Sequence, residues 1–244
     1  MSIAVPSLWL PHIASPFKKK KLSYAQTILQ DSPAAYWRLQ ETSGTTAFDS
    51  SGNGYNGTYD SAIVLGATGP FSGEYAAQFP GTDLAWVTTA SVPVLTTYPY
   101  SLEAWVFLTS AYTDHGAVFG SYGGSGGVFT DATGASLGVL DEQFLIGNGS
   151  IEFSIGTTPF PLSTWIYLVG TYDGTTMNLY INGLLNASGA LASAPAWSNT
   201  VYAIGGEGWA SSVPSMVGSM CECAVYPKVL SPTRIAAHYA ASGL

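Results

Sequence analysis

Short apolar and polar runs alternate along most of the chain, from about residue 35 to residue 226. The apolar runs are rich in Val, Ile, Tyr, Trp and Phe, and Gly, Ser, Asn and Pro separate them. Runs of this kind at regular spacing predict the strands of an all-β sandwich or barrel. The predicted strands are Ala35–Leu39, Tyr75–Phe79, Ala85–Thr88, Ser101–Leu108, Ala117–Tyr122, Gln143–Ile146, Ile151–Ile155, Trp165–Tyr172, Met177–Ile181, Val201–Ile204 and Met220–Tyr226.

Two dipeptides, Asp173-Gly174 and Asn182-Gly183, lie on either side of the run Met177–Ile181. Both are strong hairpin signals, because tight hairpin turns need a left-handed backbone that Gly, Asn and Asp adopt most easily. They predict an antiparallel meander made of this run, the run before it and the residues after Gly183.

A helix is predicted at each end of the strand-rich region. Ser23 is suited to cap a short helix over Ser23–Gln30. Ser231 followed by Pro232 is a second start signal, since proline fits the first helical turn, and it predicts a helix over Thr233–Ala241. The chain then divides into an arm (1–22), a short helix and linker (23–34) and a sandwich (35–244).

The first 22 residues predict an extended arm, because three prolines interrupt them and they form no core of their own. Apolar residues near the start are suited to bury against a partner, and the four lysines are either a solvated linker or a contact with an acidic neighbour. The expected docking residues are Ile3, Leu8, Trp9, Leu10, Lys18, Lys19, Lys20 and Lys21. The positive run follows the apolar stretch instead of preceding it, so we expect no signal peptide and synthesis in the cytoplasm.

Charge is sparse and uneven. Only 9% of residues are charged, and from Leu22 onward 3 basic and 15 acidic residues give a formal charge of −12. An acidic body disfavours a nucleic-acid partner, because binding phosphates needs a basic face. No apolar run approaches the roughly 20 residues that span a bilayer, so no membrane partner is expected. Cys221 and Cys223 fall at i and i+2 of one predicted strand, on the same face but too far apart to bridge, and are predicted to be free thiols.

Five distinctive blocks follow one another over about residues 32–241. They are SPAAYWRLQETSGTTAFDSSGNGYNGTY (Ser32–Tyr59), YSLEAWVF (Tyr100–Phe107), STWIYLVGTYDGTTMNLYING (Ser163–Gly183), AIGG (Ala203–Gly206) and CECAVYPKVLSPTRIAAHYAA (Cys221–Ala241). In this order they resemble the laminin-G-like domains of the concanavalin-A-like lectin/glucanase superfamily. The resemblance implies a jelly-roll sandwich of two antiparallel sheets, with the short N-terminal helix and one C-terminal helix beside it.

The arm and the segment before the YWRL block resemble the start of tailed-phage minor tail and virion accessory proteins that carry this domain. The resemblance implies a non-enzymatic virion component that docks on another virion protein through its arm, forms a homo-oligomer in the assembly and binds host-surface carbohydrate. Two alternatives stay open. One is a purely structural capsid or tail decoration protein without a ligand, and the other is a bacterial cell-surface carbohydrate-binding module.

A calcium site is one candidate function of the oxygen-rich loop that begins at Asp49. Asp49 and Asn53, joined by Glu222 from the last strand, are the candidate ligands, because calcium prefers oxygen donors. The alternative is a turn in which Asn and Asp bond their own backbone. The family usually has Asp where this chain has Cys221, so the implied site has lost an oxygen donor and we expect weak or absent calcium binding.

Catalysis is not predicted. Enzymes of this superfamily that cut β-glucans carry an E-x-D-x-x-E run, which places an acid and a nucleophile on one face of a strand. The chain has no such run, since Asp141 and Glu142 are adjacent and Glu222 stands alone.

Tryptophans are candidates for sugar contacts, because their rings offer flat apolar faces, but most tryptophans in strands pack in a core. Three lie inside strand blocks and are expected in the core: Trp37, Trp105 and Trp165. Three lie near loops or strand ends and are predicted as exposed ligand contacts: Trp86, Trp197 and Trp209.

Overall fold

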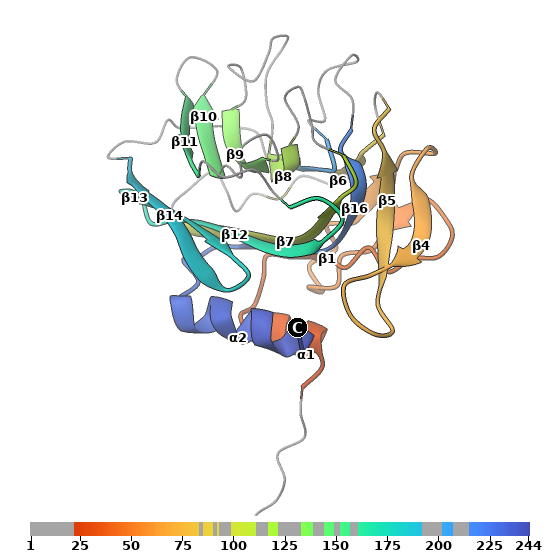
Figure 1. The fold of residues 1–244 in the computed structure, drawn as a ribbon, viewed down its shortest axis with the longest axis horizontal. Helices are drawn as coiled ribbons and strands as arrows, with labels where there is room; N and C mark the ends of the chain where they lie inside the picture. The colour runs from red at the N-terminus through yellow and green to blue at the C-terminus, as the bar shows by residue number, and fades with distance from the viewer. Residues whose placement is uncertain are drawn as a thin grey trace, which may run out of the picture.

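The computed structural model describes residues 22–82, 85–89, 92, 99–110, 117–121, 133–138, 144–148, 152–156, 161–191, 202–206 and 215–244. Over this part of the chain two antiparallel sheets face each other, and two helices lie beneath one of them (Figure 1). The predicted sandwich of two antiparallel sheets with two helices is therefore confirmed. No helix in these ranges is both long and apolar enough to span a bilayer.

The first sheet, sheet A, carries the helices. Its strands in spatial order are β14 (Leu184–Ala190), β13 (Thr176–Ile181), β12 (Trp165–Tyr172), β7 (Tyr100–Leu108), β16 (Val217–Tyr226), β5 (Tyr75–Pro80) and β4 (Val64–Thr68), and β1 (Ala35–Trp37) pairs with β16.

The second sheet, sheet B, closes the sandwich. Its strands in spatial order are β11 (Glu152–Ile155), β10 (Phe144–Asn148), β9 (Thr133–Gly138), β8 (Ala117–Ser121), β15 (Tyr202–Ile204), β6 (Val87–Thr89), β3 (Gly57–Tyr59) and β2 (Thr46–Ala47).

The main core lies between the sheets and results from the alternation of side chains along each strand. In β7, Leu102, Ala104 and Val106 point into it and are fully buried. From β1, Trp37 meets Phe119 of β8 edge to face, with ring centroids 6.0 Å apart. Contacts of this kind join the two layers.

The meander predicted from the turn signals is present as β12, β13 and β14, which pair antiparallel in sequence order. Between the last two strands, Asn182 and Gly183 both have positive φ, of 49° and 81°. This is the backbone that favours Asn-Gly in a two-residue hairpin. A Cβ on Gly183 would also lie 3.1 Å from the side chain of Tyr239 in the C-terminal helix.

A bulge interrupts β16 at Glu222, where φ is +57° and the pairing with β7 shifts register between Cys221 and Ala224. The extra residue reverses the facing of the residues after it in the strand. Cys221 therefore lies under the helices and Cys223 lies between the sheets. Both thiols are free, as predicted, but the expectation that they share a face was wrong because strand alternation alone does not indicate the bulge.

The helices lie on the outer face of sheet A (Figure 1). Helix α1 (Tyr24–Leu29) begins at a capping box formed by Ser23 and Gln26, and α2 (Pro232–Ser242) is capped by Ser231. These starts agree with the predicted ones. Helix α1 packs on the sheet, because its residues Tyr24 and Ile28 are buried in a second apolar cluster. The other main members of this cluster are Tyr36, Trp105, Tyr167, Val169, Tyr226 and Ile235.

Candidate functional site

One row of side chains crosses the outer face of sheet A beyond the helices. Antiparallel pairing sets Trp165 of β12 opposite Phe107 of β7, Phe107 opposite Ser219 of β16, and Ser219 opposite Gln78 of β5. Directly paired residues in an antiparallel sheet project from the same face. The four side chains therefore line up across four neighbouring strands.

The strand pattern explains why this row faces outward. Each member is followed or preceded by a residue that points into the core between the sheets, such as Val106 beside Phe107 and Met220 beside Ser219. Ser219 is buried at 9% exposure, whereas Phe107 and Trp165 are half-buried and Gln78 is exposed. Aromatic surface on the outer face is thus left in contact with solvent.

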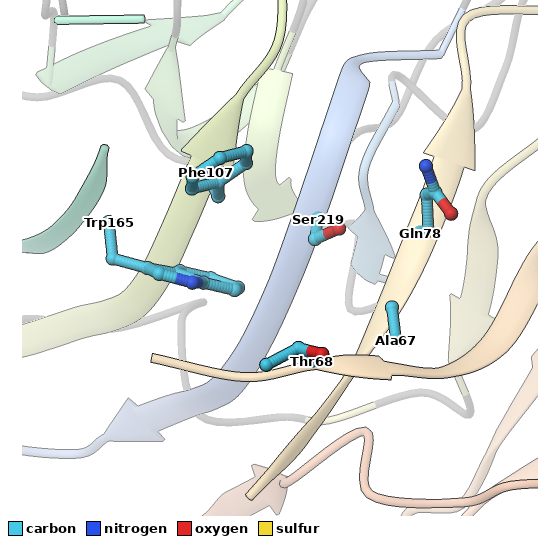
Figure 2. A pocket seen from close by; sticks show the side chains of 6 residues that line it. All are labelled: Ala67, Thr68, Gln78, Phe107, Trp165 and Ser219. Carbon is cyan, nitrogen blue, oxygen red and sulfur yellow. The ribbon is translucent and has the colours of Figure 1, made fainter. Parts of the chain in front are cut away.

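A pocket of about 350 Å³ opens over this row and is completed by Ala67 and Thr68 of the edge strand β4. Figure 2 shows the indole of Trp165 extending from the start of β12 toward the middle of the group, below Phe107 and toward Thr68. The two aromatic rings touch, with centroids 5.5 Å apart and planes at 49°. The pocket therefore has an aromatic wall on one side and small or polar side chains on the other.

The polar groups of the pocket are neutral. Within the described residues, the hydroxyls of Ser219 and Thr68 and the side-chain amide of Gln78 form no hydrogen bond with the protein. No Asp, Glu, His, Cys, Lys or Arg of the described residues lines the pocket. A flat apolar ring beside uncommitted neutral hydroxyl and amide groups suits a ligand that has both apolar and hydroxylated faces.

The helix-covered part of the same face holds a buried polar network around Glu103 of β7. The Glu103 carboxylate accepts hydrogen bonds from the hydroxyls of Tyr167 and Tyr226, and His238 of α2 lies 2.9 Å from it through Nδ1. The other ring nitrogen of His238, Nε2, lies 2.9 Å from Asp31. Glu103 and His238 are completely buried, so α2 is held to the sheet by charged groups as well as by apolar contact.

His238 and Asp31 both have pKa values shifted toward their charged forms. Burial lowers the pKa of His238, but the charges and hydrogen bonds of Glu103 and Asp31 outweigh it and raise the pKa above the usual 6.5. Burial raises the pKa of Asp31, but hydrogen bonds from Arg234 and His238 outweigh it and lower the pKa below the usual 3.8. Both shifts favour the charged pair in the folded state. Lys228 adds a contact to Asp31 at 3.3 Å.

The predicted metal ligand Glu222 belongs to a third group of side chains. Its buried carboxylate accepts hydrogen bonds from the hydroxyl of Tyr36, from Nε of Arg38 at 3.1 Å and from Nε2 of Gln40 at 3.3 Å. Arg38 also pairs with Glu74. Burial raises the pKa of Glu222 well above its usual value.

The other predicted ligands, Asp49 and Asn53, share a loop but bond the protein itself. The Asp49 carboxylate accepts hydrogen bonds from the backbone N–H of Tyr36, Ser51 and Tyr55, each at 2.9 Å, and from the hydroxyl of Ser51. The Asn53 amide donates to the Ala34 carbonyl at 2.9 Å. This geometry favours the turn over the cation, and among the described residues no three His, Cys, Asp or Glu come together as a metal site. Weak or absent calcium binding stays a prediction.

The division of the tryptophans into core and exposed residues differs from the predicted one. Trp86 is buried at 7% exposure, with its ring against Gly206, so its expected exposure was wrong. Trp37 and Trp105 are fully buried as expected, whereas Trp165 is the tryptophan that reaches a pocket. The remaining candidates lie outside the described residues: Trp197, Trp209, and the arm residues Ile3, Leu8, Trp9, Leu10, Lys18, Lys19, Lys20 and Lys21.

Trp165 was missed because its place inside a strand block favoured the core. The signal that could have found it is its neighbour in sequence. Ile166 opens the buried run of β12 and points into the core, so the residue before it must face outward.

A family model described as the concanavalin A-like lectin/glucanases superfamily matches residues 80–236. The chain belongs to this superfamily. The match covers the pocket strands β7, β12 and β16 but only the last residue of β5, and it begins later than residue 32, where the resemblance was expected to start. A comparison with curated proteins finds no match.

Solved structures with this superfamily fold are similar to the chain at low sequence identity. The binding domain of botulinum neurotoxin serotype G has 13% identity and a TM-score of 0.63, over 85% of this chain and 50% of that one. Domain 4 of an extracellular arabinanase from Geobacillus stearothermophilus, in complex with arabinotriose, has 18% identity and a TM-score of 0.58, over 85% and 98%. A Trypanosoma rangeli sialidase in complex with sialic acid has 14% identity and a TM-score of 0.59, over 84% and 32%. The chain thus spans about half of the neurotoxin binding domain and about a third of the sialidase, and these likenesses show the fold.

Proposed function

We propose that this domain is a non-enzymatic carbohydrate-binding module and that the pocket beside Trp165 is its saccharide site. The proposal is supported by the row of side chains that the helices leave uncovered on the outer face of sheet A, called the open row below. There the half-exposed indole of Trp165 lies beside the polar groups of Ser219, Gln78 and Thr68, which form no hydrogen bond with the described residues. The apolar face of a sugar ring stacks on such an indole, and its hydroxyls bond such groups. Domain 4 of the similar arabinanase, which this chain matches over 98% of its length, is in complex with arabinotriose.

The test is binding of purified protein to an array of oligosaccharides, with Trp165→Ala as the site variant and Phe48→Ala as the control. Phe48 is a 58% exposed aromatic residue that does not line the pocket. We expect at least tenfold weaker binding for Trp165→Ala and none of this loss for Phe48→Ala. Equal binding by both variants would show that the saccharide site lies outside this pocket, and no binding by the wild type would overturn the proposal.

The non-enzymatic part of the proposal rests on the absence of acid–base groups among the described residues that line the pocket. Glycoside hydrolysis needs a pair of carboxyl groups flanking the bond, and this lining contains none. The buried carboxylates of sheet A, Glu103 and Glu222, are committed to tyrosine, histidine and arginine partners. We expect no reducing sugar to be released from glucans or arabinans. Turnover abolished by a single Asp or Glu substitution would show an enzyme.

We propose the virion as the place where this module works. The support is the likeness of the N-terminal arm to the start of phage minor tail and virion accessory proteins, with the arm docking on another virion protein. A decoration protein without a ligand and a bacterial cell-surface module are the competing functions. Deleting residues 1–21 should leave the sandwich folded and block incorporation into particles. Mass spectrometry of purified particles distinguishes the virion from the cell surface, and glycan binding distinguishes a ligand-binding module from a decoration protein.

A further inference from the structure

The charge of the domain bears on the kind of sugar that its pocket accepts. Beyond the four lysines of the arm, the chain has three cationic side chains of Lys and Arg: Arg38, Lys228 and Arg234. Each of them is already paired with carboxylates. Arg38 bridges Glu74 and Glu222, and both Lys228 and Arg234 contact Asp31.

An acidic saccharide needs a cation where its carboxylate or sulfate is bound. Proteins recognise such groups mainly through Arg and Lys, because a charge taken out of water without a partner is costly. None of the three cations lines the pocket, and the described residues that line it offer two hydroxyls, one amide and the indole N–H as polar side-chain groups. These lining residues therefore offer an acidic group no charged partner.

The rest of the domain adds repulsion. From Leu22 onward the formal charge is −12, and an anion approaching the pocket meets this field over about 8–10 Å at physiological salt. A neutral sugar meets no such barrier. The same hydroxyl and amide groups bond sugar hydroxyls without any charge on either side.

On these grounds, and resting on the proposed function, we propose that the pocket beside Trp165 is selective for neutral glycans and excludes sialic and uronic acids. The selectivity comes from the absence of a cation among the described residues that line the pocket, together with the acidic body around it. Stacking on Trp165 serves neutral and acidic rings alike and so does not contribute to the discrimination.

The experiment measures binding to matched pairs that differ only in charge or in an added acidic sugar, such as lactose with sialyllactose and methyl-esterified with free oligogalacturonate. We expect at least tenfold weaker binding of the acidic member of any pair that binds, with a smaller difference in affinity between the two members at high salt. The variant Gln78→Lys places a cation in the pocket at an exposed position and should reduce this difference in affinity. Thr58→Lys, at an exposed position of β3 in sheet B, changes the net charge equally and should leave the difference in affinity unchanged.

Each outcome decides a different point. An acidic member bound as tightly as its neutral partner overturns the selectivity and leaves the carbohydrate-binding function standing. Failure of every neutral and acidic glycan to bind overturns the function itself, and the selectivity with it. If Gln78→Lys abolishes binding altogether, the wild-type comparison of matched pairs still decides the inference.

Discussion

The outer face of sheet A is used in two ways. Where α1 and α2 cover it, Trp105, Tyr167 and Glu103 are completely buried. Where the helices end, Phe107 and Trp165 stay half-exposed over a pocket. The two parts share strands β7, β12 and β16, so the difference lies in what covers them and not in the sheet.

The part of the face under the helices contains charged side chains, whereas the described residues of the open part contain none. Under the helices, three hydrogen-bonding groups satisfy the carboxylate of Glu103, because a buried carboxylate without partners would be costly there. In the open row, the polar groups of Ser219, Gln78 and Thr68 are neutral and need no charged partner. One half of the face is therefore built for stability and the other is left free for binding, and substitutions should separate these two roles.

The largest expected effect is loss of stability when the covered network is broken. Replacing His238 with Ala leaves the buried carboxylate of Glu103 without its cation, and breaking a buried pair in this way costs about 3–5 kcal/mol. Chemical denaturation measured by fluorescence should show this fall in the free energy of unfolding. Gln78→Ala in the open row is the control and should change it by no more than about 0.5 kcal/mol. A loss below about 1 kcal/mol for His238→Ala would mean that α2 is held by its apolar contacts alone.

The same substitution made on each half should separate stability from binding. Trp105 donates its indole N–H to the Tyr24 hydroxyl at 2.8 Å in a fully buried place. Trp105→Phe leaves that hydroxyl without its donor and opens a cavity, and should lower the free energy of unfolding by about 1–3 kcal/mol. Trp165→Phe, half-exposed, should cost less than about 1 kcal/mol and weaken glycan binding instead. Equal losses of stability from the two variants would contradict the division of the face.

The covered half could be foreseen from the sequence in outline only. Ser231 and Pro232 fixed the start of α2 because capping is a local effect. The contact of His238 with both Glu103 and Asp31 joins residues 135 and 207 positions apart. Nothing in a strand or helix pattern specifies such a pairing, since it depends on where the helix is placed on the sheet.

The open half shows a second limit. The alternation of side chains along β7 and β12 can be predicted from the sequence, and it places Phe107 and Trp165 on one face once the strands are paired. The sequence did not show which part of that face the helices leave uncovered, so Trp165 was expected in the core and Trp86 at the surface. The bulge at Glu222 was missed for a related reason, because a single residue with left-handed backbone has no strong signal when it is not Gly or Asn.

A smaller effect is expected from pH, and again from the covered half alone. Because Glu103 and Asp31 raise the folded-state pKa of His238 above 6.5, its stabilisation is fully present below pH 6.5 and is lost as pH rises through the folded-state pKa. The free energy of unfolding of the wild type should therefore fall more steeply than that of His238→Gln as the pH rises above 6.5. Other shifted groups, Glu222 and the tyrosines facing the network, are common to both proteins and cancel in the comparison.

A variant in the row that lines the pocket serves as the control, because the pH dependence of stability should come from His238 and not from that row. Trp165→Phe should show the same pH dependence as the wild type, because no titratable group among the described residues lines the pocket. Parallel curves for the wild type and His238→Gln would show that the histidine is not charged in the folded protein.

The smallest expected effect is that of calcium, which should leave both halves unchanged. The carboxylate of Asp49 already accepts hydrogen bonds from three backbone N–H groups and one hydroxyl, and a bound cation would have to compete with these donors. Glu222 is likewise engaged by Arg38, whose positive charge disfavours a nearby cation. A ligand that binds only the folded state raises Tm by mass action, so removal of calcium by EGTA should leave Tm unchanged. Asp49→Ala is the informative variant, since it should lower Tm equally with and without calcium through loss of the turn. A wild-type Tm that falls by many degrees in EGTA would show a calcium cage built from other residues of the chain.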